Sequence, residues 1–504
     1  MSADTETAPG GAETVPATEA PATVETIVPR RTIVLGTIGS LLMLIGGLGA
    51  AAGVVNDPIM SDGVFSWMRY GHGKMLCTIV VYAGYVLLIW AWIRLGRQVL
   101  AGRVGTRPVL IAAACWIAPM LLAPAMFTSD VYSYLAQGAV ALAGIDPFSA
   151  GPGILTSPEL LENVHPFWLD QPSPYGPVFI LLAKFAVWLT GTNILVGSLL
   201  MRVLLLPGLA LLLWALPGLV RHLGGRLPVA AWALFAGPLM VVHLVGGPHN
   251  DLLMVGFLAA GTLLLLDRKH VAGFALVTLA VATKASALVA VPFLVWVWAG
   301  HLSSTRWRNF ARACACAVVV FAVVLAAVSL AAGVNVGWIH HIDASSKLVN
   351  WLGAPTAAGE LVHAIIGIAV QVPETVVITV TRLVGQAILV LVLVRLWWRS
   401  RAAEGPDVVR KAAYALFAVA LLSPTLLPWY LMWGLVLAVG LPWKPRQLAV
   451  FVGVSVFMVA PYSADGQQMM YNWAWIALAV AASVLAAVSL VRPDPLHWSA
   501  RPVA

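Results

Sequence analysis

The sequence predicts an all-α polytopic membrane protein of 504 residues. Hydrophobic residues make up 61% of the chain, charged residues only 10%, and the mean hydropathy is +0.91. Soluble domains carry roughly 25% charged residues, so this composition excludes an ordinary soluble fold. The apolar residues form repeated runs of about 20 residues, which indicate transmembrane helices. The runs do not alternate apolar and polar residues, which excludes a transmembrane β-barrel.

The two ends of the chain are predicted to be tails. Residues 1–29 contain acids but no Lys or Arg, and many Ala, Thr and Pro, which predicts a disordered cytoplasmic tail. They lack the basic start and cleavage site of a signal peptide, so the next run is expected to be an uncleaved first span. Residues 492–504 are expected to form a short cytoplasmic tail. Most of the excess of Lys and Arg lies in short loops, where it reports topology and not nucleic-acid binding.

The positive-inside rule orders the first spans. Two arginines before run 33–55 place the N-terminus inside, so this run leads out. Run 75–96 returns to a cluster of arginines, and run 109–126 leads out again. Segment 127–174, which follows, is therefore expected to lie outside the membrane.

Segment 127–174 is acidic, aromatic and rich in proline, and it contains no Lys or Arg. A helix beginning near Asp130 would place Asp130, Tyr134 and Gln137 on one face and apolar residues on another, which predicts a helix lying on the membrane surface. An external segment of this kind between spans is where an extracytoplasmic active site would lie.

The middle of the chain contains four further runs, at 177–190, 195–220, 228–246 and 252–266. The first is short and either spans or re-enters the membrane. Run 271–300 has basic clusters at both ends, so both ends are expected inside. We therefore expect this run to enter and return as two short helices, with Lys284 near the tip.

The last third of the chain continues the pattern. Run 313–333 leads out to a second external segment, 334–357, and run 374–396 returns. The remaining runs are 412–426 and 428–441, which form a hairpin kinked around two prolines, and then 447–462 and 473–491. The total is about 13 membrane segments, and no internal repeat of the transporter kind is evident.

Asp130 is the first candidate for chemistry. A carboxylate at the membrane boundary can take a proton from a hydroxyl nucleophile. The alternative is that Ser129 or Asp130 caps the helix by satisfying its free N–H groups.

The segment GGPHND (246–251) is the second candidate. His249, Asn250 and Asp251 could line a polar cavity at the outer leaflet, or Asn250 and Asp251 could simply cap the next helix. No second His lies at ligand spacing, so no metal site is predicted.

Lys284 is the third candidate, because a Lys inside an apolar segment usually faces a cavity or a partner. An anionic ligand such as a lipid phosphate is a natural partner, and a snorkelling Lys is the alternative. Arg382, inside run 374–396, could share this role.

Four aromatic residues stand beside external loops, where they either stack on sugar rings or anchor the spans at the interface: Trp168, Tyr175, Trp351 and Trp429.

Six motifs occur in order along the chain: SDVYSYLAQG (129–138), IDPFSAGP (145–152), PSPYGPVF (172–179), GGPHNDLLM (246–254), ATKASALVAVPF (282–293) and PTLLPWYLMW (424–433). Together they resemble the actinobacterial polyprenyl-phosphate-mannose-dependent α-(1→6)-mannopyranosyltransferases of the GT-C type. The resemblance covers roughly residues 30–490 and implies a GT-C-like bundle of about 13 transmembrane segments, with a catalytic domain at 30–491.

The resemblance also implies an activity. The donor would be polyprenyl-phosphate-mannose, and the acceptor a phosphatidylinositol-anchored mannan (lipomannan or lipoarabinomannan) at the outer face of the plasma membrane. Transfer would invert the β-mannosyl donor to an α linkage, with no cofactor, metal or nucleic acid. Asp130 would be the general base, and Lys284 and Arg382 would bind the donor phosphate. Further candidates for binding sugar are Tyr132, Gln137, Tyr175, His249, Asn250, Asp251 and Trp351.

Two other classes of function remain open on the residues. One is another polyprenyl-phosphate-sugar glycosyltransferase, which transfers arabinose or mannosylates protein. The other is a flippase or transporter of lipid-linked sugars, which would work without a catalytic base. The absence of repeats and the acidic external segments favour an enzyme over a transporter.

Overall fold

The structure is a computed structural model that describes residues 27–492. Helices dominate these residues, and extended pairing among them is limited to isolated bridges. The all-α prediction is therefore confirmed. The predicted tails at 1–29 and 492–504 lie outside the described residues, apart from 27–29 and Arg492.

Within the described part of the chain, six helices are long and apolar enough to cross a membrane: α1 (Arg30–Ala50), α2 (Gly71–Leu100), α8 (Ile194–Leu223), α13 (Arg306–Ala332), α15 (Glu374–Ser400) and α19 (Trp473–Val491). Run 228–246 is not one straight helix. It consists of α9 (Leu227–Phe235) and a π-helix, η3 (Leu239–Gly246), bent by 45°, and would make a seventh span.

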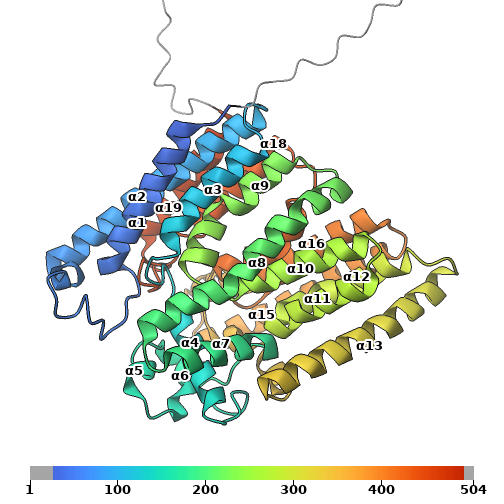
Figure 1. Ribbon diagram of the computed structural model, residues 1–504, viewed down its shortest axis with the longest axis horizontal. Helices are drawn as coiled ribbons and strands as arrows, with labels where there is room; N and C mark the ends of the chain where they lie inside the picture. Colours follow the sequence, from blue (N-terminus) through green and yellow to red (C-terminus); the bar gives the residue numbers. More distant parts are fainter. Residues whose placement is uncertain (1–26, 493–504) are drawn as a thin grey trace, which may run out of the picture.

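Shorter helices complete the bundle. The main ones are α3 (Thr106–Met120), α4 (Asp130–Leu142), α7 (Pro177–Thr190), α10 (Asp251–Leu266), α11 (His270–Thr283), α12 (Val291–Ala299), α14 (Ala354–Ile366), α16 (Gly405–Leu422), α17 (Leu431–Ala438) and α18 (Pro445–Phe457). Single turns form α5 (Pro158–Leu161) and α6 (Pro166–Leu169). Figure 1 shows α4 to α7 gathered at one end of the molecule, at the lower edge of the view.

The break predicted inside run 271–300 is confirmed. Helix α11 ends at Thr283, Lys284 is extended, and a 3₁₀-helix, η4 (Ala285–Ala290), leads into α12. Lys284 leaves the helical conformation and pairs with Tyr175 in an isolated antiparallel bridge. The interruption of the helix therefore fixes this Lys against the segment that precedes α7.

The prediction that helix 130–142 lies on the membrane surface is wrong. A helix does form there, but residues 131–141 are all buried. Helix α4 packs on α7 and α8, and a Cβ at Gly138 would lie only 2.4 Å from the carbonyl group of Ala183. The amphipathic pattern reflects packing inside the protein, because Tyr175 and Phe179 pack on Tyr134 and Ser173 donates a hydrogen bond to Gln137, so the face that was expected to meet water is covered.

Glycine also allows two longer helices to meet closely. A Cβ at Gly208 on α8 would lie 2.2 Å from the carbonyl oxygen of Leu252, and one at Gly256 on α10 would lie 2.5 Å from that of Gly208. Small residues let membrane helices pack backbone to backbone. Helices α13 and α15 differ, because only 17% of their apolar windows is buried, so their remaining surface is free to face lipid.

Candidate active site

A cavity of about 540 Å³ lies where the start of α4 meets η4, the end of α16 and segment 424–433. Its polar lining combines the carboxylates of Asp130 and Asp343 with the ammonium of Lys284. Its aromatic lining consists of Trp168, Tyr175, Trp429, Tyr430 and Trp433. The cavity thus offers acids, one cation and flat apolar rings, which suits a polar ligand with a ring and a phosphate.

Asp130 is the first residue of α4, and 18% of its side chain is exposed toward the cavity. The preceding residue, Ser129, makes no side-chain capping bond. Instead the hydroxyl oxygen of Thr128 accepts the backbone N–H of Asp130 at 3.1 Å. The capping alternative therefore has no support at Ser129, and the carboxylate of Asp130 faces the cavity.

His249 lies directly behind Asp130. Its Nε2 is 3.6 Å from Oδ2 of Asp130, and its ring stacks on Trp429 with centroids 3.6 Å apart. Its Nδ1 is 2.7 Å from the carbonyl oxygen of His243, which can only accept, so Nδ1 carries a hydrogen. A hydrogen on Nε2 as well would point to the carboxylate. The side chain of His249 is fully buried, so it contacts the cavity only through its neighbours.

Lys284 and Asp251 form a buried ion pair. Nζ of Lys284 lies 2.7 Å from Oδ2 of Asp251, and Trp433 donates its indole N–H to Oδ1 at 2.6 Å. Asp251 is fully buried, whereas 13% of the Lys284 side chain remains exposed. An ammonium has three hydrogens, and Asp251 takes one of them. The exposed part of the Lys284 side chain lines the cavity, so the ammonium is accessible to a ligand there.

Aromatic rings surround the same ammonium. Nζ of Lys284 lies 4.9 Å from the ring centre of Tyr430, 5.5 Å from that of Trp433 and 5.9 Å from that of Tyr175. Such contacts stabilise a cation. Burial, followed by the charge of Asp130, holds the pKa of Tyr175 well above its usual value, so its hydroxyl stays protonated.

Asn250 lies between His249 and Asp251 in sequence and is fully buried. It makes no side-chain capping bond to α10, and neither its amide nitrogen nor its amide oxygen has a hydrogen-bond partner among the described residues. The capping alternative is therefore not supported for Asn250. Neither Asn250 nor Asp251 lines the cavity directly.

Two predicted sugar-binding residues on α4 point elsewhere. Tyr132 donates its hydroxyl to the carbonyl of Ala52 and lines a separate small cavity. Gln137 is buried, and its side-chain oxygen accepts the hydroxyl of Ser173 at 2.8 Å. Both side chains hold α4 against neighbouring segments, so we assign neither a contact with substrate.

Trp351 also lies away from the cavity. It donates its indole N–H to the carbonyl of Met470 at 2.9 Å and stacks on Trp473. Trp351 is therefore held by protein contacts outside the cavity lining.

Arg382 does not line the cavity either. Its guanidinium donates to the carbonyls of Ser346 and Leu348 at 2.8 and 2.9 Å and to the hydroxyl of Thr356 at 2.9 Å. Because Ser346 lines the cavity, Arg382 supports its wall.

Sequence reasoning missed several cavity residues. Tyr430 and Trp433 lie within the motif at 424–433, but nothing in the motif indicates that Trp433 binds Asp251. Asp343 and Gln386 line the cavity from the second external segment and from α15. Gln386 lies one helical turn after Arg382, so spacing along α15 was the signal that could have found it. Among residues 27–492, no group of three or more His, Cys, Asp or Glu is placed to hold a metal ion.

Comparison with known proteins gives two family matches. Residues 33–300 match a family described as "Alpha-(1->6)-mannopyranosyltransferase, N-terminal domain". Residues 355–492 match the "MptB C-terminal domain". The two matches cover most of the described chain, and the first includes Asp130, His249, Asp251 and Lys284.

Full-length relatives carry the same description. The chain is 40% identical over 453 residues to alpha-(1->6)-mannopyranosyltransferase A of Mycobacterium tuberculosis, covering 89% of this chain and 87% of the relative. It is 31% identical over 471 residues to the protein of the same name from Corynebacterium glutamicum, covering 89% and 96%. A second protein of Mycobacterium tuberculosis, also an alpha-(1->6)-mannopyranosyltransferase, is 28% identical over 548 residues.

Proposed function

Because the chain belongs to the alpha-(1->6)-mannopyranosyltransferase family, we propose that it transfers mannose from polyprenyl-phosphate-mannose to the α-1,6-mannan of lipomannan and lipoarabinomannan. The chain is a membrane mannosyltransferase; donor, acceptor and mechanism are the proposal. The observation that carries it is that Asp130 and Lys284 line one cavity with an aromatic wall. This cavity offers a base for a hydroxyl, a cation for a phosphate and rings for a sugar.

In the proposed reaction, Asp130 takes the proton of the acceptor 6-hydroxyl as its oxygen attacks the anomeric carbon. The bond between that carbon and the phosphate oxygen breaks on the opposite face, and polyprenyl phosphate leaves. A β-linked donor therefore gives an α linkage. The phosphate leaves as an anion and needs little help from an acid, so one carboxylate suffices.

Lys284 stabilises the charge that grows on the leaving phosphate, through the hydrogens that Asp251 does not use. Asp251 and Trp433 hold the Lys284 side chain at the cavity wall. His249 positions the carboxylate of Asp130 from behind. Arg382 acts at a distance, through the wall segment that contains Ser346.

The rest of the proposal concerns architecture. We infer one catalytic domain over residues 30–491, a GT-C-like bundle of about 13 membrane segments, and an active site on the periplasmic side of the plasma membrane. Six long helices, one bent pair and several shorter apolar helices support a bundle of this kind. The distribution of Lys and Arg supports the orientation.

The test uses purified protein, radiolabelled polyprenyl-phosphate-mannose and an α-1,6-mannan acceptor. We expect new α-1,6 linkages, and a loss of about a hundredfold or more in kcat for Asp130→Asn. Asp170→Asn is the matched control, because it makes the same change at an exposed position in the same segment, away from the cavity. Near-normal turnover of Asp130→Asn would show that Asp130 is not the general base. Transfer only from an arabinose donor, or only to protein, would contradict the proposed donor or acceptor.

A further inference from the structure

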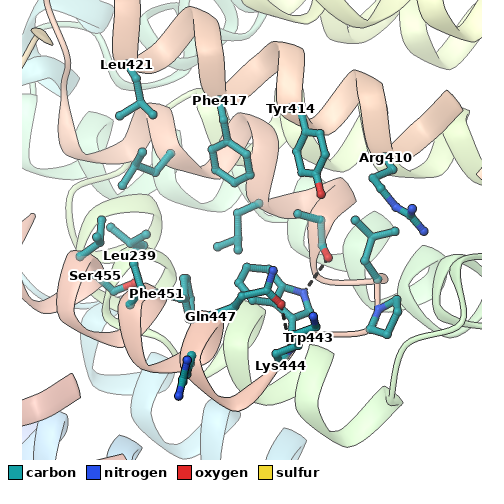
Figure 2. A pocket seen from close by; sticks show the side chains of 18 residues that line it. Leu239, Arg410, Tyr414, Phe417, Leu421, Trp443, Lys444, Gln447, Phe451 and Ser455 are labelled. Carbon is teal, nitrogen blue, oxygen red and sulfur yellow. Dashed lines mark hydrogen bonds between the residues drawn. The ribbon is translucent and has the colours of Figure 1, made fainter. Parts of the chain in front are cut away.

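A second and larger cavity, of about 740 Å³, lies between α16, α17 and α18. Figure 2 shows Leu421, Phe417, Tyr414 and Arg410 in order along α16 on one side, with Phe451 and Lys444 on the other. The lining is apolar toward Leu421 and becomes basic and polar toward Arg410. We call this cavity the α16–α18 groove.

The α16–α18 groove is separate from the candidate active site. The two cavities share no lining residue, although both adjoin α16. The active-site cavity uses Val419 and Ser423 at one end of α16, whereas the groove places Arg410 near the other end. Thirteen residues of helix separate Arg410 from Ser423, which corresponds to about 20 Å.

Cations gather at the basic end of the groove. Arg410, Lys444 and Arg446 line it. Arg410 pairs with Asp407 at 3.4 Å, but Lys444 and Arg446 are exposed and form no ion pair within residues 27–492. The indole of Trp443 is fixed beside them by a 2.8 Å hydrogen bond to the carbonyl of Ala438. This end of the groove therefore offers unpaired positive charge.

We propose that the α16–α18 groove binds one anionic membrane phospholipid, with its phosphate at Lys444 and Arg446 and an acyl chain along Phe417 and Leu421. Basic pockets between membrane helices bind the head groups of anionic lipids. The apolar walls continue from this basic end, so one molecule with a charged head and a hydrocarbon tail complements both parts.

A phospholipid fits this groove better than the polyprenyl-phosphate donor does. The donor must place its phosphate beside Lys284 and Asp130, and the basic end of the groove lies about 20 Å along α16 from that cavity. The positive-inside pattern also predicts that the end of α16 with Arg410 and Lys411 is cytoplasmic. The lipid therefore comes from the inner leaflet and binds at the end opposite to the transfer reaction.

The experiment titrates delipidated, purified protein with dioleoyl phosphatidylglycerol and dioleoyl phosphatidylcholine, which share acyl chains, and counts bound lipids by native mass spectrometry. We expect one phosphatidylglycerol to bind in preference to phosphatidylcholine. Lys444→Gln/Arg446→Gln should weaken it about 25-fold, roughly fivefold for each charge removed. Val450→Trp, which fills the groove, should weaken both lipids.

Arg308→Gln/Arg312→Gln is the matched control, because it removes two exposed cations from α13, outside the groove. The control should bind like the unmodified protein, and thermal unfolding checks that each variant is folded. Equal affinity for the two lipids, or equal loss in the control, would overturn the proposal. So would competition for the groove by polyprenyl phosphate, which would assign the groove to the donor.

Discussion

The carboxylates of Asp251 and Asp130 have different surroundings, and this difference decides their roles in the proposed reaction. Asp251 is fully buried and is neutralised by the ammonium of Lys284 and the indole N–H of Trp433. Asp130 remains partly exposed, and Nε2 of His249 lies 3.6 Å from its Oδ2. Because the lone pairs of Asp251 are already engaged, Asp130 is the one of these two carboxylates that can accept a proton from an acceptor hydroxyl.

The position of His249 behind Asp130 predicts an effect on turnover. His249→Phe keeps a ring to stack on Trp429 but removes both nitrogens, and we expect kcat to fall about a hundredfold with little change in KM. His249→Gln, whose amide can donate an N–H to Asp130, should recover part of this loss. Steady-state kinetics on both variants measure the difference. Equal activity in the two variants would show that only the volume of the side chain matters.

The Lys284–Asp251 pair predicts that stability and activity can be separated. Lys284→Met leaves Asp251 buried without its counter-ion, which should cost about 3 kcal/mol of folding free energy. Lys284→Met/Asp251→Leu removes both charges and should recover most of that stability. Transfer should remain lost in both variants, because neither supplies a cation to the phosphate. A double variant as unstable as the single one in thermal unfolding would contradict this account.

Single elements show what the sequence can and cannot predict. The break at Lys284 was predictable, because basic clusters at both ends of one apolar run require it to return. The burial of α4 was not, because an amphipathic helix looks the same whether its polar face meets water or other protein. The contact of Asp130 with His249 was not predictable either, since it joins segments 119 residues apart through the packing of α4, η3 and η7 (Pro428–Tyr430). The separation of the two residues along the sequence therefore gave no indication of this contact.

Helix α15 predicts an effect through the wall of the cavity. Arg382→Gln removes the donors that hold the carbonyls of Ser346 and Leu348, each hydrogen bond to a charged group contributing about 1.5 kcal/mol or more. The loosened wall should raise the KM for the donor about tenfold and change kcat less. Arg399→Gln is the control, because it removes an exposed cation from the same helix. An unchanged KM in Arg382→Gln would show that this wall does not contact the donor.

Across the whole molecule, helix α16 connects two sites that are lined by charged side chains. The active-site cavity lies at one end of this helix and the basic end of the α16–α18 groove at the other. Loops at the level predicted to be cytoplasmic also carry a histidine pair that flanks run 271–300, with Nε2 of His270 2.8 Å from Nδ1 of His301. The contact between His270 and His301 joins the start of α11 to the residues after α12, at the end opposite to Lys284.

The histidine pair predicts how the stability of the whole protein depends on pH. Burial, then the partner histidine and Arg268, lower the pKa of His270 below its usual value of 6.5, and burial and Arg268 lower that of His301. Well above pH 6.5 both histidines are neutral whether the chain is folded or unfolded, so they add no pH dependence. Below it the unfolded chain takes up protons that the folded pair resists, so stability falls as the pH falls. We expect the thermal midpoint in detergent to drop from pH 7.5 to 5, and to drop less in His270→Gln/His301→Gln. If the thermal midpoint falls equally with pH in the unmodified protein and in the double variant, other groups cause the pH dependence.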